Sequence, residues 1–194
     1  IDVNEFFDIC PAIKKFFIKI GKVYDDSKPY VYEGGQLPEI VKNVVKSIIV
    51  SDSVTKLHSE CFSGCNLLKS ITIPDSVTEI GSGCFYDCTS LESIDIPSSV
   101  TKLGMYYCFA YCDSLKSITI PNSVTNIGDN CFNFCQSLES ITIPDSVTKL
   151  GDESFAECNS LQSISIPNSV TEIGNGCFYN CESLESIDIP SSVT

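Results

Sequence analysis

The stretch Leu91-Glu-Ser-Ile-Asp-Ile-Pro-Ser-Ser-Val-Thr-Lys-Leu-Gly104 decides the fold, because near-copies of it recur along most of the chain. Its tripeptide Ser-Val-Thr begins at positions 53, 76, 99, 123, 146, 169 and 192, so the spacing is 23 residues except for one of 24. A unit this short cannot bury its own apolar face, and the copies must therefore stack on one another. The repeat predicts a solenoid.

Two extended segments are expected in each unit. Leu91, Ile94 and Ile96 are separated by polar residues, which predicts a short strand with one buried face. The proline that follows ends this strand because it cannot donate to a ladder. Val77 and Ile80 point inward across a second short extended piece. Stacking would then align the equivalent apolar residues of successive units into continuous rows.

A third segment, Cys-Phe-x-x-Cys, completes the unit. Cys84, Phe85 and Cys88 have the spacing of one face of a helical turn, and the two residues between them would fall on the other face. Gly81 precedes this segment and suggests either a positive φ or a close approach of backbone. The predicted phenylalanine spine consists of Phe62, Phe85, Phe109, Phe132, Phe155 and Phe178.

The charge distribution excludes some functions. The formal net charge is −13, of which residues 45–194 carry 6 − 18 = −12, and every basic residue is Lys. Nucleic-acid binding and docking on an anionic membrane both need clustered positive charge, so neither is expected. The residues after Ser-Val-Thr place no like charges on neighbouring units: they are Lys56, Glu79, Lys102, Asn126, Lys149 and Glu172.

Twelve cysteines allow three interpretations. Five units carry a complete pair, 61/65, 84/88, 108/112, 131/135 and 177/181, whereas Cys158 lacks its mate and Cys10 lies outside the repeats. Zinc is disfavoured by the spacing and by the single histidine, His58, and disulfides remain an alternative. We prefer buried free thiols that act as small apolar groups, because Ser154 replaces one of them without other change. With one histidine, no catalytic base and nucleophile pair is evident, and no enzyme, cofactor or metal is expected.

The pattern Leu-x-Ser-Ile-x-Ile-Pro-x-Ser-Val-Thr-x-Ile-Gly-x-x-Cys-Phe-x-x-Cys resembles the BspA-type leucine-rich repeat of bacterial and protozoan surface proteins. The resemblance covers residues 45–194, as six units and the start of a seventh. It implies an α/β leucine-rich-repeat solenoid with a parallel β-sheet on the concave face and short extended and helical turns on the convex side. It also implies adhesion or binding of proteins at the cell surface; a cytoplasmic location with reduced thiols is the alternative.

Residues 1–44 do not match the repeat and are expected to cap its first unit. Apolar residues from Phe6 to Val23 recur at helical spacing, and a competing interpretation places strands over residues 16–24 and 30–33. The chain stops in mid-unit at Thr194 without a polar capping sequence, which predicts a fragment of a longer protein. The uncapped end could associate with a second copy.

Two surfaces are candidates for binding. Outward aromatic and apolar residues cluster near the 24-residue unit: Tyr86, Met105, Tyr106, Tyr107, Tyr111, Phe134 and Tyr179. Alternatively, these rings simply lie flat on neighbouring units and cover the core. The second surface is the polar row of the sheet: Lys69, Glu92, Asp95, Lys116, Glu139, Glu185 and Asp188.

These features favour a non-enzymatic module that binds a protein or glycan ligand. A structural spacer, whose working part lies beyond Thr194, is the first alternative. A cysteine-based metal or redox protein is the second.

Overall fold

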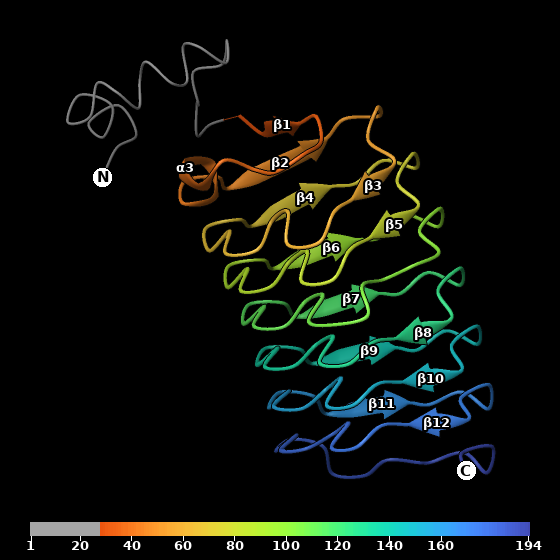
Figure 1. Ribbon diagram of the computed structural model, residues 1–194. Coiled ribbons are helices and arrows are strands. Elements are labelled where there is room, and N and C mark those ends of the chain that lie inside the picture. The colour runs from red at the N-terminus through yellow and green to blue at the C-terminus, as the bar shows by residue number, and fades with distance from the viewer. Residues whose placement is uncertain (1–27) are drawn as a thin grey trace.

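The computed structural model describes residues 28–194, which form a parallel β-solenoid of about six turns (Figure 1). One column holds the longer strands: β2 (Ser47–Val50), β4 (Ser70–Thr72), β6 (Ser93–Asp95), β7 (Ser117–Thr119), β9 (Ser140–Thr142) and β11 (Ser163–Ser165). A second column holds two-residue strands: β3 (Lys56–Leu57), β5 (Glu79–Ile80), β8 (Asn126–Ile127), β10 (Lys149–Leu150) and β12 (Glu172–Ile173). The two extended segments predicted for each unit are therefore confirmed.

Strands in the first column pair in parallel, with equivalent residues side by side. Ile94 lies opposite Ile118, which lies opposite Ile141 in the next strand. The ladder forms two groups, β1-β2-β4 and β6-β7-β9-β11, and β4 and β6 are in contact across the gap between them. The predicted parallel sheet is confirmed, and its inward row is buried as the alternation of apolar and polar residues requires.

The phenylalanine spine is confirmed and forms the centre of the core. Five of its rings, from Phe62 to Phe155, are fully buried, and Phe178 is half-buried. Successive ring centroids are 5.2–5.6 Å apart, and from Phe85 onward the ring planes lie within 9° of parallel. Each ring thus packs against its own equivalent in the next unit and helps to join the units.

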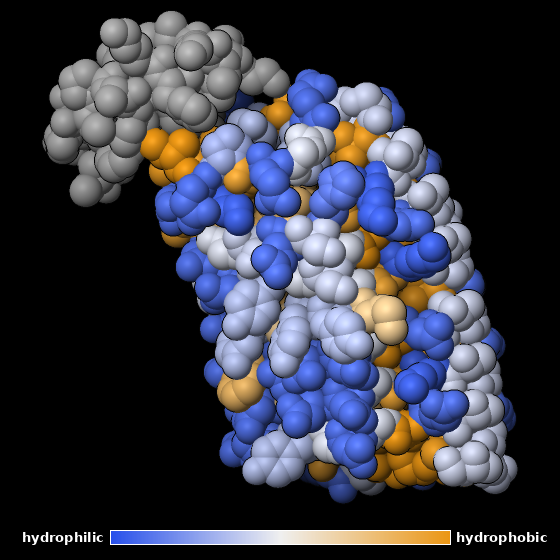
Figure 2. Space-filling view, in the orientation of Figure 1, coloured by the Kyte–Doolittle hydropathy of each residue, from blue (hydrophilic) through white to orange (hydrophobic). Residues whose placement is uncertain are grey.

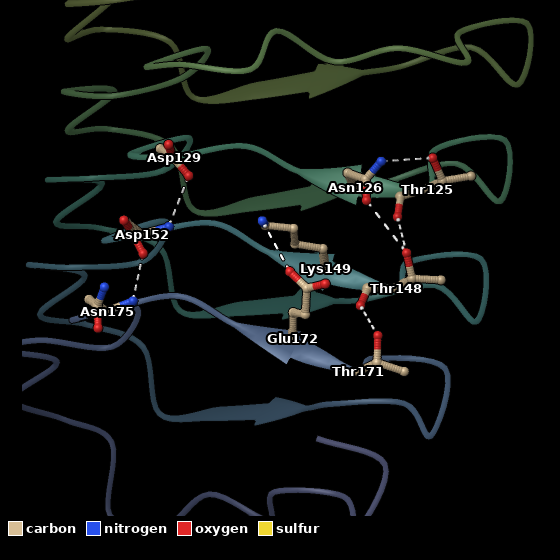
Figure 3. A network of polar contacts seen from close by, with 9 residues as sticks. All are labelled: Thr125, Asn126, Asp129, Thr148, Lys149, Asp152, Thr171, Glu172 and Asn175. Atoms are coloured by element: carbon tan, nitrogen blue, oxygen red, sulfur yellow. Dashed lines mark hydrogen bonds and ion pairs between the residues drawn. The ribbon is translucent and has the colours of Figure 1, made fainter. Parts of the chain in front are cut away.

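The serine and threonine of Ser-Val-Thr make the hydrogen bonds that tie one unit to the next. Ser99 Oγ donates to the carbonyl of Val77 at 2.7 Å, and Ser146 Oγ donates to the carbonyl of Val124 at 2.6 Å. The threonine hydroxyl donates to the threonine carbonyl of the unit before, as in the Thr125–Thr148–Thr171 run of Figure 3. These bonds recur because each buried turn carbonyl needs a donor.

The expected helical turns, and with them the α/β label, are not confirmed. Among residues 28–194 the only helix is α3 (Glu39–Lys42), and it lies outside the repeats. Each Cys-Phe-x-x-Cys segment is a chain of turns in which the residue before each cysteine position is left-handed, such as Gly83 at φ 61° and Asp87 at φ 59°. A left-handed residue breaks a right-handed helix, although both cysteines still face the core.

The glycine before this segment is required by close packing, not by a positive φ. A Cβ on Gly151 would lie 2.5 Å from the backbone nitrogen of Asp129, and one on Gly81 would lie 2.4 Å from that of Ser59. In the first unit this position is the exposed His58, which follows the edge strand β3. Of the two reasons predicted for this glycine, the close approach of backbone is therefore confirmed, and the positive φ is not.

Residues 28–44 cover the first unit. Strand β1 (Tyr30–Tyr32) pairs in parallel with β2, so the strand interpretation of residues 30–33 is confirmed for these three residues. Tyr32 is 1% exposed and its ring meets that of Phe62 edge-on at 4.8 Å, which closes the spine. The helical spacing from Phe6 to Val23 and the alternative strand over residues 16–24 lie outside the described residues.

Replacement of Gly151 by Ala is expected to lower the free energy of unfolding by about 3 kcal/mol, because the new Cβ would overlap backbone of the preceding unit. A thermal unfolding curve followed by circular dichroism measures the change. Asn175→Ala, at an exposed position one unit further on, is the control and should leave the midpoint within about 1 °C. Equal midpoints for the two variants would contradict the close packing.

Candidate binding surface

The predicted aromatic residues gather on one face of the stack. Tyr86, Tyr106 and Tyr107 are 37%, 49% and 43% exposed, and Met105 is 68% exposed. In Figure 2 bulky pale-blue side chains lie together at mid-height of the visible face, beside a pale-orange one. Tyr179 is 67% exposed and lies several units further along, away from this group. We call Tyr86, Met105, Tyr106, Tyr107, Tyr111 and Phe134 the tyrosine face.

Ring contacts divide the tyrosine face into two parts. Tyr111 stacks on Phe134, with ring centroids 4.9 Å apart and planes within 5°, and both residues are half-buried. The structure therefore shows that the rings of these two residues lie flat and cover the neighbouring unit, which is the alternative interpretation given above. Tyr86 instead meets Tyr107 and Tyr111 edge-on, at 6.1 Å and 5.4 Å, and this leaves ring faces open to solvent.

The extra residue of the 24-residue unit interrupts the second column. No strand forms at Lys102 and Leu103, where only an isolated bridge joins Lys102 to Glu79. The next bridge joins Tyr106 to Asp129. If the register that aligns residue 102 with residue 126 had continued, Met105 would lie opposite Asp129, so the pairing has moved by one residue. The second column is therefore divided into β3-β5 and β8-β10-β12, with Met105 between the two parts.

Two surface hollows flank the insertion, and Tyr106 lines both. The first, about 760 Å³, has walls from Tyr86, Tyr106, Tyr107 and Tyr111, and its remaining lining is Ser59, Glu60, Ser63, Ser82 and Gly83. The second, about 770 Å³, lies where the ladder is interrupted, between Lys102 to Tyr106 on one side and Asn126 to Asp129 on the other. We call the first the tyrosine hollow and the second the ladder hollow.

The surroundings of the tyrosine hollow are electronegative. Burial, followed by the nearby Tyr86, Tyr107, Asp113 and Asp87, raises the pKa of Tyr111 above its usual range. The pKa of the Asp113 carboxyl is raised by burial and then by Asp87, and its Oδ1 finds no hydrogen-bond partner among the described residues. Glu60 is the one charged residue in the lining of the hollow.

The polar row of the sheet is exposed as predicted, and one pair of its charges meets between units. Lys69 Nζ lies 3.4 Å from Glu92 Oε1. Asp95 ends β6, and Lys116 and Glu139 lie just before β7 and β9; all are exposed. Glu185 and Asp188 are exposed in the last unit. Towards its end the row carries a hollow of about 540 Å³, lined by Gln162, Ser163, Glu182, Ser183 and Glu185, with no aromatic residue among them. Exposed charges of this kind form a solvated surface.

Opposite charges also alternate along the second column, as expected. Glu79 accepts from Lys56 at 2.8 Å and from Lys102 at 3.1 Å, and these hydrogen bonds lower the pKa of its carboxyl. Lys149 donates to Glu172 at 3.1 Å, which raises the pKa of the ammonium group (Figure 3). In the same view Asp129 and Asp152 each accept a hydrogen bond from the backbone N–H one unit further on.

The described cysteines are free and, except for the half-buried Cys181, buried. From the second unit onward, the second cysteine donates its thiol to the phenylalanine carbonyl of the preceding unit, as Cys135 does to Phe109 at 3.1 Å. At the position of the first cysteine, Ser154 Oγ lies 3.2 Å from Cys177 Sγ, so serine replaces cysteine as a hydrogen-bonding group. These thiols act as donors as well as apolar groups, which the sequence alone did not indicate.

Burial makes most of these thiols poor nucleophiles. It raises the pKa of Cys65 and Cys177 to about 12 and that of the fully buried Cys84 well above its usual value. Cys61 is the exception, because its hydrogen bond with Cys84 Sγ, at 3.4 Å, lowers its pKa. Within residues 28–194 no three potential ligands among His, Cys, Asp and Glu are grouped to hold a metal ion.

The regular turns, the phenylalanine spine and the two-column sheet agree with one family of repeats. The sequence profile of the BspA type leucine-rich repeat region matches six copies, over residues 42–135 and 105–194. The chain belongs to the BspA-type leucine-rich repeat family. The tyrosine face therefore stands on the turn segments of a BspA-type array, at its one unit of irregular length.

Solved structures share this fold. A leucine-rich repeat protein from Bacteroides ovatus is 38% identical, with a TM-score of 0.73, and the match covers 77% of this chain but 38% of that protein. The leucine-rich repeat protein of T. pallidum is 29% identical, with a TM-score of 0.69, and the match covers 74% of this chain and 68% of that one. One from Eubacterium ventriosum is 28% identical, with a TM-score of 0.70, over 76% of this chain and 40% of that one.

No curated protein matches the chain. This chain spans well under half of the Bacteroides and Eubacterium proteins, so the activity of a whole BspA-type protein is not carried over from them. In the described range, no helix has the length and apolarity that crossing a membrane requires.

Deletion of Met105 is expected to restore the 23-residue spacing, because two residues would then separate Gly104 from Cys108, as two separate Gly81 from Cys84. Residues 102–103 should pair with β8, and the ladder hollow should close. A crystal structure of the variant tests this, with thermal unfolding to show that the array still folds. A folded variant that kept the interrupted ladder would show that the insertion is not its cause.

The thiols are expected to react slowly in the folded protein. Cys181 should react first with Ellman's reagent, and the buried thiols with raised pKa more than about 100-fold more slowly than in guanidinium, because the thiolate is the nucleophile. Cys181→Ser should remove the fastest phase that comes from the repeats. Fewer than twelve reactive thiols in guanidinium without reductant would instead support the disulfide or metal interpretation.

Proposed function

We propose that this BspA-type array is a non-enzymatic protein-binding module of a cell-surface protein, and that the tyrosine face is its contact surface. One observation carries the proposal: three exposed tyrosines and Met105 gather where the extra residue interrupts the array. Large, rigid rings that keep a hydroxyl in water are the side chains that dominate protein interfaces.

The scaffold supports this assignment. Leucine-rich-repeat solenoids are generally binding scaffolds without catalytic machinery, and BspA-type repeats are typical of protein-binding surface proteins. Rows of equivalent residues hold the turns in place, so the tyrosines project from a rigid frame that is ordered before a partner arrives. Pre-ordering of this kind reduces the entropy cost of association.

The polar row of the sheet is the competing surface, and a glycan is the competing ligand. Lys69 and Glu92 of this row are paired with each other, so a partner would have to displace an existing contact there. If neither surface binds, the array is a spacer. The same experiment separates these alternatives.

Binding is measured by biolayer interferometry against a panel of purified extracellular-matrix and cell-surface proteins and immobilised glycans. The test variant combines Tyr86→Ala, Tyr106→Ser and Tyr107→Asn, which the chain already uses at equivalent positions as Ala110, Ser82 and Asn130. We expect at least a tenfold loss of affinity for a bound protein, because exposed aromatic anchors contribute about 2 kcal/mol or more each.

Two control variants accompany it. Tyr179→Ala removes an exposed tyrosine outside the tyrosine face, and Lys116→Glu with Glu139→Lys changes the polar row; neither should alter affinity. Loss of binding only in the charge-swapped variant would assign the function to the sheet. Binding that survives every variant would discard both surfaces, and no binding to any panel member would favour the spacer.

A further inference from the structure

The tyrosine hollow has the construction of a site for a positively charged side chain. Tyr107 and Tyr111 meet Tyr86 edge-on, with interplanar angles of 85° and 67°, so the rings lie in different planes around one space. The volume of about 760 Å³ leaves room for a long side chain and part of its backbone. The face of a tyrosine ring attracts a cation placed within about 6 Å of its centre.

Charge selects among possible occupants. Glu60 is the charged residue in the lining, Asp87 and Asp113 lie near Tyr111, and no lysine lines the hollow. A phosphate or carboxylate would meet only negative charge there. A lysine or arginine would gain the ring faces and a carboxylate together, in a repeat region whose net charge is −12.

The hollow is also specific to one place in the array. The position of Tyr107 is occupied in the other units by Glu60, Gly83, Asn130, Glu153 and Gly176. The insertion therefore brings an aromatic ring to a turn position that is otherwise small or polar. Tyr107 remains 43% exposed, and the other units fold with a different residue at this position, so the turn itself does not require the ring.

We propose that the tyrosine hollow receives a lysine or arginine side chain from a basic segment of the partner protein. This inference rests on the proposed function and adds the chemistry of the partner. Such a partner would be drawn first by the negative field of the array and then held by the ring faces.

The experiment uses small probes and the whole chain. Backbone amide resonances are followed by NMR during titration with N-acetyl-lysine amide, N-acetyl-arginine amide, the uncharged N-acetyl-norleucine amide and methyl β-glucoside. We expect the two cationic probes to shift the amides of Gly83, Tyr86 and Tyr107 with millimolar affinity, and norleucine amide to bind at least fivefold more weakly. Added salt should weaken the cationic probes.

Variants identify the groups responsible. Tyr107→Phe keeps the ring and should keep binding, Tyr107→Asn should reduce it at least fivefold, and Glu60→Gln should reduce it for the cationic probes alone. Tyr179→Ala is the matched control and should change nothing. Unchanged thermal unfolding in each variant ensures that a loss of binding is not a loss of fold.

Each other outcome overturns the inference. Equal affinity for norleucine amide would make the hollow an apolar site, and binding of the glucoside alone would make it a glycan site. Absence of any shift would show that the hollow is unoccupied by these groups. If a protein still binds through the tyrosine face while the cationic probes do not, the proposed function stands and only the nature of the contact is wrong.

Discussion

The structure depends on the stacking of each residue against its equivalent in the next unit. A single translation brings Phe85 onto Phe109, the Ser99 hydroxyl onto the Val77 carbonyl, and Cys112 onto the carbonyl of Phe85. Because one translation must satisfy all these contacts, the units have to be nearly identical in sequence and length. The repetition of Ser-Val-Thr follows from this requirement: serine is the donor and valine the core residue at every step.

The same constraint explains where variation collects. An added residue cannot be absorbed within a strand without shifting every later contact, so Met105 is accommodated in the turn. Register is recovered by the bridge between Tyr106 and Asp129, and below it β8, β10 and β12 pair regularly. As a local consequence, residues 102–103 do not form a strand that would pair with β8, and only the bridge from Lys102 to Glu79 remains. The result is a pair of hollows on an otherwise uniform surface, which is what a specific contact requires.

The sequence predicted the features that stacking dictates and missed those that turn geometry dictates. Alternating Leu91, Ile94 and Ile96 were enough to predict the strand and its buried face, and the spacing of Phe residues was enough to predict the spine. The spacing of Cys84 and Cys88 wrongly suggested a helical turn, because two cysteines can also face inward across left-handed residues. A signal was present: Gly64, Gly83, Gly176, Asn130 and Asn180 occupy those positions, and glycine and asparagine tolerate positive φ best. The sequence predicted that the candidate tyrosines cluster near the 24-residue unit, but the hollow that four of them line depends on ring orientations that the sequence does not specify.

Tyr107 shows why stability alone does not account for this surface. It has a φ of 54°, where a side chain other than glycine or asparagine costs about 1 kcal/mol. Its edge contact with Tyr86 returns a similar amount, about 0.5–1.5 kcal/mol, and the buried part of the side chain adds to this, although the residue remains 43% exposed. A ring is not required for this turn conformation, because Asn130 adopts it one unit later at a φ of 54°. The exposed part of the Tyr107 ring, in a hollow that Glu60 also lines, is therefore the part available to the partner that we propose.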